Sequence, residues 1–237
     1  MLDSKPLTKW HDKSLPMSED CLQLNMWVPK NTSGAVVVFI FGGDYYSGSP
    51  SLKYYNGAAL ASMTKAIIIN INYRLGVLGF GYYKGKKYVS GNMGLLDQQM
   101  ALRWIKGNIK NFGGNPSKVA LFGHEVGAVS ATAHLYAPNS KGLFNKIFAS
   151  SGTVQHSWGY EKNSVVEKNF IKLMKKVKCY HASASSSINC MQKKNVYQLV
   201  NMTDAVEEEN EFAFTKPFLI VEKDEVFFKG NLTSKII

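Results

Sequence analysis

The residues whose types and spacing could do chemistry lie in the stretch Gly123-His124-Glu125-Val126-Gly127. An apolar run at residues 119–122 leads into two glycines that are separated by three residues, and a segment of small residues that predicts a helix follows. This pattern is typical of a tight strand-to-helix turn that lifts its central side chain above a parallel sheet. The glycines allow backbone to pass where a Cβ would clash. The central side chain is the carboxylate of Glu125, so a hydroxyl nucleophile is missing from the turn.

The segments that would position this turn alternate between strands and helices. Continuous apolar runs predict buried strands at residues 35–41, 66–73, 119–122 and 146–149, and an alternating pattern predicts a more exposed strand at 22–27. Helical spacing predicts helices at 95–112, from the turn to about 136, and at 164–178. Strands separated by helices favour an α/β fold with a largely parallel sheet.

Two of these helices have a predicted apolar face. In the helix at 95–112 the face comprises Leu96, Met100 and Trp104, flanked by Ala101, Ile105 and Ile109. In the helix at 164–178 it comprises Val166, Phe170, Leu173 and Val177, with lysines facing outward. The spacing of both sets is that of one side of an α-helix that packs against a core.

The chain is basic, with 28 Lys and Arg residues against 17 Asp and Glu residues and a formal net charge of +11. Such a balance is compatible with nucleic acid, with an anionic membrane, or with a lysine-rich solvated surface. No nucleic-acid-binding module accompanies the lysines, which favours the solvated surface. No apolar run reaches the roughly 18 residues of a membrane-spanning helix, so we expect no insertion into a membrane by this chain.

Three cysteines bear on the cellular compartment. Cys179 and Cys190 flank a Ser- and Ala-rich stretch, residues 181–189, which predicts a surface loop closed by a disulfide, and Cys21 is left over. Glycosylation sequons begin at Asn31, Asn201 and Asn231. Disulfide and sequons together indicate an extracellular or secreted glycoprotein. The first twenty residues are polar and unlike a signal peptide, so this interpretation requires a signal upstream of the chain.

Several motifs, in order along nearly the whole chain, resemble type-B carboxylesterases. They are Ser18-Glu19-Asp20-Cys21-Leu22, Gly42-Gly43, Tyr55-Asn56-Gly57, Asn72-Tyr73-Arg74-Leu75-Gly76, Gly91-Asn92, Gly94-Leu95-Leu96-Asp97-Gln98, Phe112-Gly113-Gly114-Asn115-Pro116 and Ser151-Gly152. The run Tyr46-Ser47-Gly48-Ser49 and the cysteine spacing are most similar to the cholinesterase branch. The resemblance implies an α/β-hydrolase fold with helices on both faces of the sheet. It also implies that residues 1–237 form one partial domain, because the family domain is usually more than twice this length.

For the site, the resemblance implies that Glu125 stands where the family has its nucleophilic serine, preceded by His124. The oxyanion-hole positions correspond to Gly43, Asp44 and Val126, and an acid at Asp44 would oppose the developing negative charge. The family takes its triad acid and histidine from sequence beyond the region around Pro217, and neither His134 nor His156 matches that histidine. We therefore expect no intact catalytic residue.

The resemblance further implies a ligand pocket lined by aromatic residues, for each of which core packing is the alternative: Trp10, Trp158, Phe212 and Phe214. We hypothesise that Asp44, Glu125 and Trp10 hold an organic cation without hydrolysing it. No cofactor is expected, and no metal-ligand spacing is recognisable around His124. Arg74 and Asp97 are expected to form a buried ion pair.

The sequence thus predicts a catalytically inactive, cholinesterase-like protein that acts as a binding or adhesion module for another extracellular protein or an organic cation. One alternative is a carboxylic-ester hydrolase known only from an incomplete or degenerate sequence. Another is a gene relic that scarcely folds, because a sheet edge left open invites aggregation.

Overall fold

A computed structural model of the chain describes residues 17–207 and 216–236. Its centre is a five-stranded sheet in the order β1-β3-β2-β6-β7. The strands are β1 (Leu24–Trp27), β2 (Val36–Ile40), β3 (Ile67–Ile71), β6 (Val119–His124) and β7 (Lys146–Ser150). Each lies within one or two residues of the segment that the apolar pattern predicts. The strands β3, β2, β6 and β7 run parallel and β1 is antiparallel to β3, so the largely parallel sheet is confirmed.

The chain leaves β2 and β6, which are neighbours in the sheet, in opposite directions. From β2 the chain passes to β3 on one side, and from β6 it passes to β7 on the other. Loops that leave two neighbouring parallel strands in opposite directions leave room at the carboxyl ends of those strands, where ligands of open α/β sheets bind. The loop after β2 and the turn at Glu125 meet at this point, because Ile40 is in register with Gly123.

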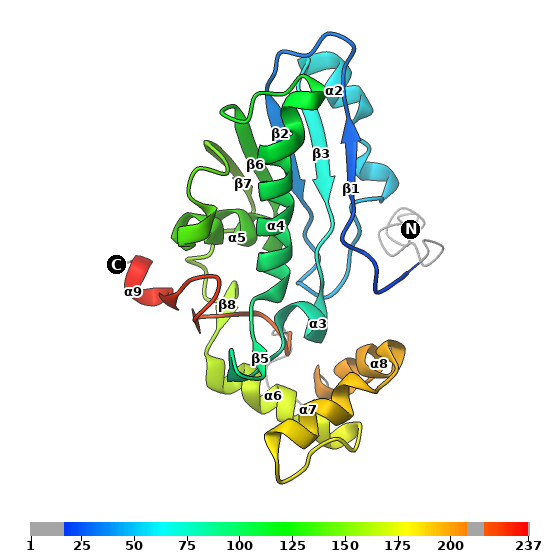
Figure 1. The fold of residues 1–237 in the computed structure, drawn as a ribbon, viewed down its shortest axis with the longest axis vertical. Coiled ribbons are helices and arrows are strands. Elements are labelled where there is room, and N and C mark those ends of the chain that lie inside the picture. Colours follow the sequence, from blue (N-terminus) through cyan, green and yellow to red (C-terminus); the bar gives the residue numbers. More distant parts are fainter. Residues whose placement is uncertain (1–16, 208–215, 237) are drawn as a thin grey trace, which may run out of the picture.

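Helices cover both faces of the sheet, as predicted (Figure 1). On one face, α4 (Met93–Asn108) and α5 (Val126–Ala133) enclose the main core, in which Val38, Ile69 and Leu121 are fully buried. On the other face, α2 (Ala58–Thr64) packs its Ala61 against Ile68 of β3. The sheet is therefore buried on both sides at β3, whose five residues are all buried.

The buried face of α4 differs from the predicted one. Met100 and Trp104 are 51% and 42% exposed, whereas Leu95, Leu102 and Ile105 are buried. The cause is that two polar residues, Gln98 and Gln99, are also on the buried face of the helix. Gln98 forms hydrogen bonds with Ser130 and His134, and Gln99 forms one with Ser140. A pattern based on apolar residues alone places these two glutamines on the solvent side. The predicted buried face is therefore rotated about the helix axis relative to the observed one.

The second half of the chain adds a helical layer at the carboxyl ends of the parallel strands (Figure 1). It comprises α6 (Asn163–Lys176), α7 (Ala184–Gln192) and α8 (Val196–Glu207). The predicted inward residues of α6 are buried, namely Val166, Phe170, Leu173 and Val177. The amphipathic pattern of this helix is confirmed.

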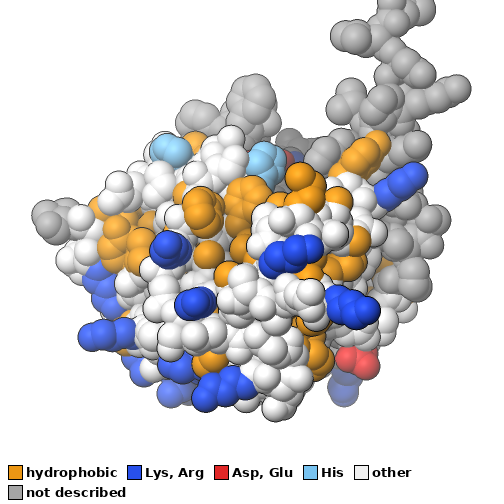
Figure 2. All heavy atoms as spheres, turned by 90° about the horizontal axis from the view of Figure 1, so that it is seen from above, with side chains coloured by type: hydrophobic (Ala, Val, Ile, Leu, Met, Phe, Trp, Pro, Cys, Tyr) orange, Lys and Arg blue, Asp and Glu red, His pale blue; other side chains and the backbone are white. Residues whose placement is uncertain are grey.

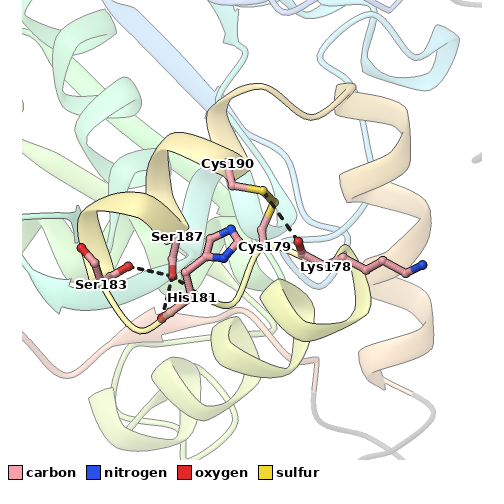
Figure 3. The surroundings of a disulfide bond; sticks show 6 residues. All are labelled: Lys178, Cys179, His181, Ser183, Ser187 and Cys190. Atoms are coloured by element: carbon pink, nitrogen blue, oxygen red, sulfur yellow. Dashed lines mark hydrogen bonds between the residues drawn. A yellow bond between two sulfur atoms is a disulfide. The ribbon is translucent and has the colours of Figure 1, made fainter.

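The disulfide between Cys179 and Cys190 forms, with a Cα–Cα distance of 5.4 Å (Figure 3). The stretch between the two cysteines is not the predicted loop, because α7 begins at Ala184. Ser183 caps that helix by accepting a hydrogen bond from the Ser186 amide, and Ser187 bonds the carbonyls of His181 and Ser183. Serines that favour turns thus serve here as the cap and first turn of a helix.

The remaining elements are short. They are the 3₁₀ turns η2 (Lys53–Tyr55), η3 (Ile109–Phe112), η4 (His134–Tyr136) and η5 (Pro138–Ser140), the helices α3 (Gly76–Phe80) and α9 (Thr233–Ile236), and the strands β4 (Tyr82–Gly85), β5 (Val89–Ser90), β8 (Tyr160–Glu161), β9 (Ile220–Val221), β10 (Lys223–Asp224) and β11 (Gly230–Asn231). Within residues 17–207 and 216–236, no helix has the length and apolar character that crossing a bilayer requires.

Arg74 and Asp97 form the expected ion pair, which ties the loop after β3 to the second turn of α4. The guanidinium binds both carboxylate oxygens at 2.7 Å, and the Arg74 amide donates to the same carboxylate at 3.1 Å. The Asp97 side chain is 4% exposed and that of Arg74 is 39% exposed, so only the acid is buried.

Candidate functional site

Glu125 occupies the turn between β6 and α5 in a backbone conformation that L-residues rarely adopt, with φ 56° and ψ −120°. Such a conformation costs on the order of 1–3 kcal/mol and persists where the surroundings fix it. Here the Glu125 amide donates to the Ser150 carbonyl at 2.9 Å, and its carbonyl accepts from Ala128 and Val129. The turn is therefore held from β7 on one side and from α5 on the other.

The glycines around Glu125 are required by close packing of backbone. A Cβ at Gly123 would collide with the backbone of Gly127, and a Cβ at Gly127 would collide with the carbonyl of Ile40. The start of α5 thus lies directly against β6 and β2. The Gly-x-x-x-Gly spacing is explained by this contact, because any larger residue would push the helix away from the sheet.

The loop after β2 faces Glu125. In it Gly43, Asp44 and Tyr45 all have positive φ, at 124°, 56° and 59°. Amides of Tyr46 and Ser47 donate to the Gly43 carbonyl at 2.9 and 3.0 Å, which closes the loop into a tight turn. The consequence is that the amides of Gly43 and Asp44 point out of the loop. They face the strand-to-helix turn at residues 123–127, which we call the elbow.

Both of these amides bind the side chain of Glu125. Its Oε2 atom accepts a hydrogen bond from Gly43 N at 2.5 Å and one from Asp44 N at 3.3 Å. Two backbone N–H groups that converge on one oxygen form a cradle for negative charge. In this chain the negative charge is supplied by the protein itself. Val126, the third predicted position, begins α5 and lines the same cavity.

A second carboxyl group lies next to the first. Partial burial raises the pKa of Asp44, and the adjacent Glu125 carboxylate, which lies within hydrogen-bonding reach, raises it further; Lys216 acts in the opposite direction. Two neighbouring carboxyl groups resist simultaneous ionisation, because like charges at short range repel. The carboxyl group of Asp44 therefore takes up a proton more readily than an isolated aspartate does.

The two acids open into a cavity of about 360 Å³. It is lined by Asp44, Glu125, Val126, Ser151, Trp158, Lys216 and Leu219. Trp158, a predicted pocket residue, is 40% exposed, and the ring of His156 stacks on it at 5.3 Å. The other predicted pocket residues, Trp10, Phe212 and Phe214, lie outside the described residues. None of the described residues that line this cavity is a histidine.

Three lining residues were not predicted from the sequence. Ser151 has positive φ (59°) and lies in the Ser151-Gly152 motif, so that motif could have indicated it. Gly152 touches the elbow, since a Cβ there would collide with the Glu125 carbonyl. Lys216 and Leu219 lie far along the chain from the other residues that line the cavity, and no local sequence pattern indicates either of them.

A buried polar network supports the elbow from behind. The Tyr45 hydroxyl donates to the Val126 carbonyl at 3.0 Å and contacts Ser130 at 3.1 Å. Gln98 joins Ser130 to His134, whose other ring nitrogen contacts Ser140 at 2.8 Å. Burial lowers the pKa of His134 to about 3, so the ring is neutral at physiological pH. His134 is thus a structural residue of the core.

The remaining predicted positions are on the surface or half-buried. His124, at the end of β6, is exposed. Asn31 and Asn201 are exposed, and Asn231 is half-buried with its Oδ1 accepting from the Thr233 amide at 2.9 Å. No group of His, Cys, Asp and Glu that could hold a metal ion occurs in the described part of the chain.

The parallel sheet, the strand–elbow–helix turn after β6 and the facing glycine loop define an α/β hydrolase. The chain belongs to the carboxylesterase family, whose model matches residues 3–232. It is 43% identical over 221 residues to acetylcholinesterase 4 of Caenorhabditis briggsae, an alignment that covers 92% of this chain and 36% of that protein.

Vertebrate proteins show a similar relationship. The identity to acetylcholinesterase of Danio rerio is 39%, over 78% of this chain and 30% of that protein. The identity to cholinesterase of Mus musculus is 38%, over 78% of this chain and 31% of that protein. The chain therefore spans about a third of the length of these relatives.

Proposed function

We propose that this cholinesterase-like chain does not hydrolyse esters and acts as an extracellular binding module. The observation that carries the proposal is the pair of hydrogen bonds from Gly43 and Asp44 to the Glu125 carboxylate. In an ester hydrolase such a pair of amides receives the oxyanion of the substrate. Here an internal anion occupies it, at the position where the family resemblance places the serine.

The nucleophile position, the oxyanion donors and the charge of Asp44 all act against hydrolysis. A carboxylate that attacked an ester would form a mixed anhydride, whereas an attacking hydroxyl forms an acyl ester. The elbow carries no hydroxyl group. Loss of the nucleophile from a comparable hydrolase lowers turnover by about a millionfold. Loss of one oxyanion donor costs about 3–4 kcal/mol of transition-state stabilisation. The Asp44 carboxyl adds unfavourable charge beside the same site.

The same residues suit a cationic ligand. Asp44 and Glu125 bring negative charge to a cavity of about 360 Å³, and the indole of Trp158 forms part of its wall. An indole face and a carboxylate together attract an organic cation. We therefore propose an organic cation or an extracellular protein as the partner of this module.

A serine-directed fluorophosphonate probe and a turnover assay test the proposal. We expect no labelling of the purified chain and no hydrolysis of acylcholine or nitrophenyl acetate above the rate without protein. Hydrolysis that disappears in Glu125→Ala would overturn the proposal. It would favour instead the second candidate, an ester hydrolase, which the names of the similar proteins suggest.

Calorimetry with choline esters tests the ligand. Heat of binding is expected at millimolar concentration, and Asp44→Asn should weaken the affinity by removing one of the two acids. If neither the wild type nor Asp44→Asn releases heat, the organic cation is excluded. A protein is then the remaining candidate partner.

A further inference from the structure

The sheet edge at which the parallel strands begin carries a group of exposed lysines, which we call the basic face. They lie in the turns before β2, β3, β6 and β7, at the first residue of β7, near the end of α4 and in η3. The group consists of Lys30, Lys65, Lys106, Lys110, Lys118, Lys141 and Lys146.

Hydrogen bonds join the segments that carry these lysines into one surface. The Ser33 amide donates to the Lys65 carbonyl at 2.7 Å, and the Val36 amide donates to the Lys118 carbonyl at 2.9 Å. The Lys106 ammonium donates to the Gly142 carbonyl at 2.7 Å, which links the end of α4 to the turn before β7. The lysines therefore project from neighbouring turns of a single rigid edge.

Among the residues that the structure describes, no acidic residue interrupts the basic face. The segments that build it, residues 28–36, 57–67, 101–120 and 137–148, contain no Asp or Glu. Acidic residues lie at the other end of the strands, where Asp44 and Glu125 line the cavity and Asp97 lies in the second turn of α4. In the view down on this face, blue Lys and Arg side chains lie among orange hydrophobic ones, and a red side chain is visible at the lower rim (Figure 2).

Large apolar side chains are exposed among these lysines. Met63 and Leu60 of α2 are 83% and 45% exposed, and Trp104 of α4 and Phe112 of η3 are 42% and 39% exposed. The rings of Trp104 and Phe112 contact each other, with centroids 6.3 Å apart. These side chains are thus not buried in the core, although apolar surface of this size in water is unfavourable.

We propose that the basic face binds an anionic lipid surface, with the lysines over the headgroups and the apolar side chains at the level of the interface. Lysines near such a surface each contribute attraction, and Trp, Phe and Met side chains partition into the interfacial region. A sulfated glycan or a nucleic acid would satisfy the lysines but would leave Met63 and Leu60 in water. The lipid surface accounts for both kinds of side chain and requires no spanning helix.

Sedimentation with lipid vesicles tests this inference on the full chain. Vesicles of phosphatidylcholine mixed with phosphatidylserine should bind the protein, and pure phosphatidylcholine should not. The binding should decrease as salt rises, because screening weakens the attraction. Heparin in place of vesicles tests the glycan: heparin binding without vesicle binding would overturn the inference.

Matched charge reversals separate the basic face from the overall charge of the chain. Replacement of Lys30, Lys110 and Lys118 by Glu should weaken vesicle binding about a hundredfold, at roughly fivefold per lysine. Replacement of Lys86, Lys168 and Lys193 by Glu makes the same change in charge at exposed positions elsewhere, and should weaken binding far less. Equal losses in the two variants would mean that no particular face binds, and would refute the inference.

Met63→Ser tests the apolar contribution without disturbing the core, because Met63 is 83% exposed. We expect severalfold weaker vesicle binding with the salt dependence unchanged. Unchanged affinity would contradict an apolar contact. Circular dichroism of every variant checks that any loss of vesicle binding is not due to unfolding.

Discussion

The Oε2 atom of Glu125 lies 2.5 Å from the amide nitrogen of Gly43, although the two residues are 82 positions apart in the chain. The contact joins the turn after β6 to the loop after β2 across the centre of the sheet. It satisfies an amide that would otherwise face the cavity, and it fixes the direction of the Glu125 side chain. The elbow and the glycine loop thereby hold each other in place.

The backbone of Glu125 should be strained, and two substitutions measure the strain. Glu125→Gly and Glu125→Ala both remove the carboxylate, so they differ mainly in the cost of φ 56° and ψ −120°. We expect the Gly variant to be more stable than the Ala variant by about 1 kcal/mol, because glycine adopts positive φ without a Cβ clash. Urea unfolding of the two proteins measures the difference. Equal stability would show that the turn relaxes once the side chain is gone.

Asp44 should make the stability of the protein depend on pH. Partial burial and the Glu125 carboxylate raise the pKa of Asp44, so the folded chain holds this proton at a pH where the unfolded chain has released it. The contribution of this group to stability is present below the ordinary Asp pKa and is lost as pH rises through the raised one. Asp44→Asn cannot ionise, and it should therefore become more stable relative to the wild type over that rise. A constant difference between the two proteins across the range would contradict the prediction.

His134 should act in the opposite direction. Its pKa of about 3 in the folded chain lies below the ordinary value, so the unfolded chain binds this proton first. The unfolding free energy should therefore fall as pH decreases from about 6.5 toward 3, by roughly 1.4 kcal/mol per pH unit from this group.

The comparison with His134→Gln isolates that effect from the titrating carboxylates. Glutamine keeps hydrogen-bonding capacity toward Gln98 and Ser140 but cannot be protonated in this range. The variant should lose less stability than the wild type between pH 6 and pH 4, although it starts lower. Parallel pH profiles would mean that His134 is accessible to protons in the folded chain.

The disulfide should stabilise the helical layer that α6 and α7 form. Its closed segment has a sequence separation of 11, for which the chain-entropy model gives about 3 kcal/mol. Cys190→Ala should therefore lower the unfolding free energy by about 2–3 kcal/mol. Cys21→Ala, at the free and half-buried cysteine, provides the control and should have a small effect. The difference between wild type and Cys190→Ala should vanish in reducing buffer.

The sequence by itself determined the elements and the frame of the elbow. Apolar runs such as residues 35–41 form buried strands because a residue buried on both faces of a sheet has to be apolar, whatever its partners. The apolar stripe of α6 follows the helical period for the same local reason. The cysteines at 179 and 190 are near enough in the chain to pair without information from elsewhere.

Tertiary structure decided what the side chains of the site contact. The sequence predicted that Glu125 stands at the elbow, but not that its carboxylate binds the amides of Gly43 and Asp44. That contact depends on the register between β2 and β6, which involves segments about eighty residues apart. The rotation of α4 and the contribution of Lys216 to the cavity likewise depend on distant partners. Local patterns record which residues are buried on average, whereas hydrogen bonds across the sheet are fixed only when the strands align.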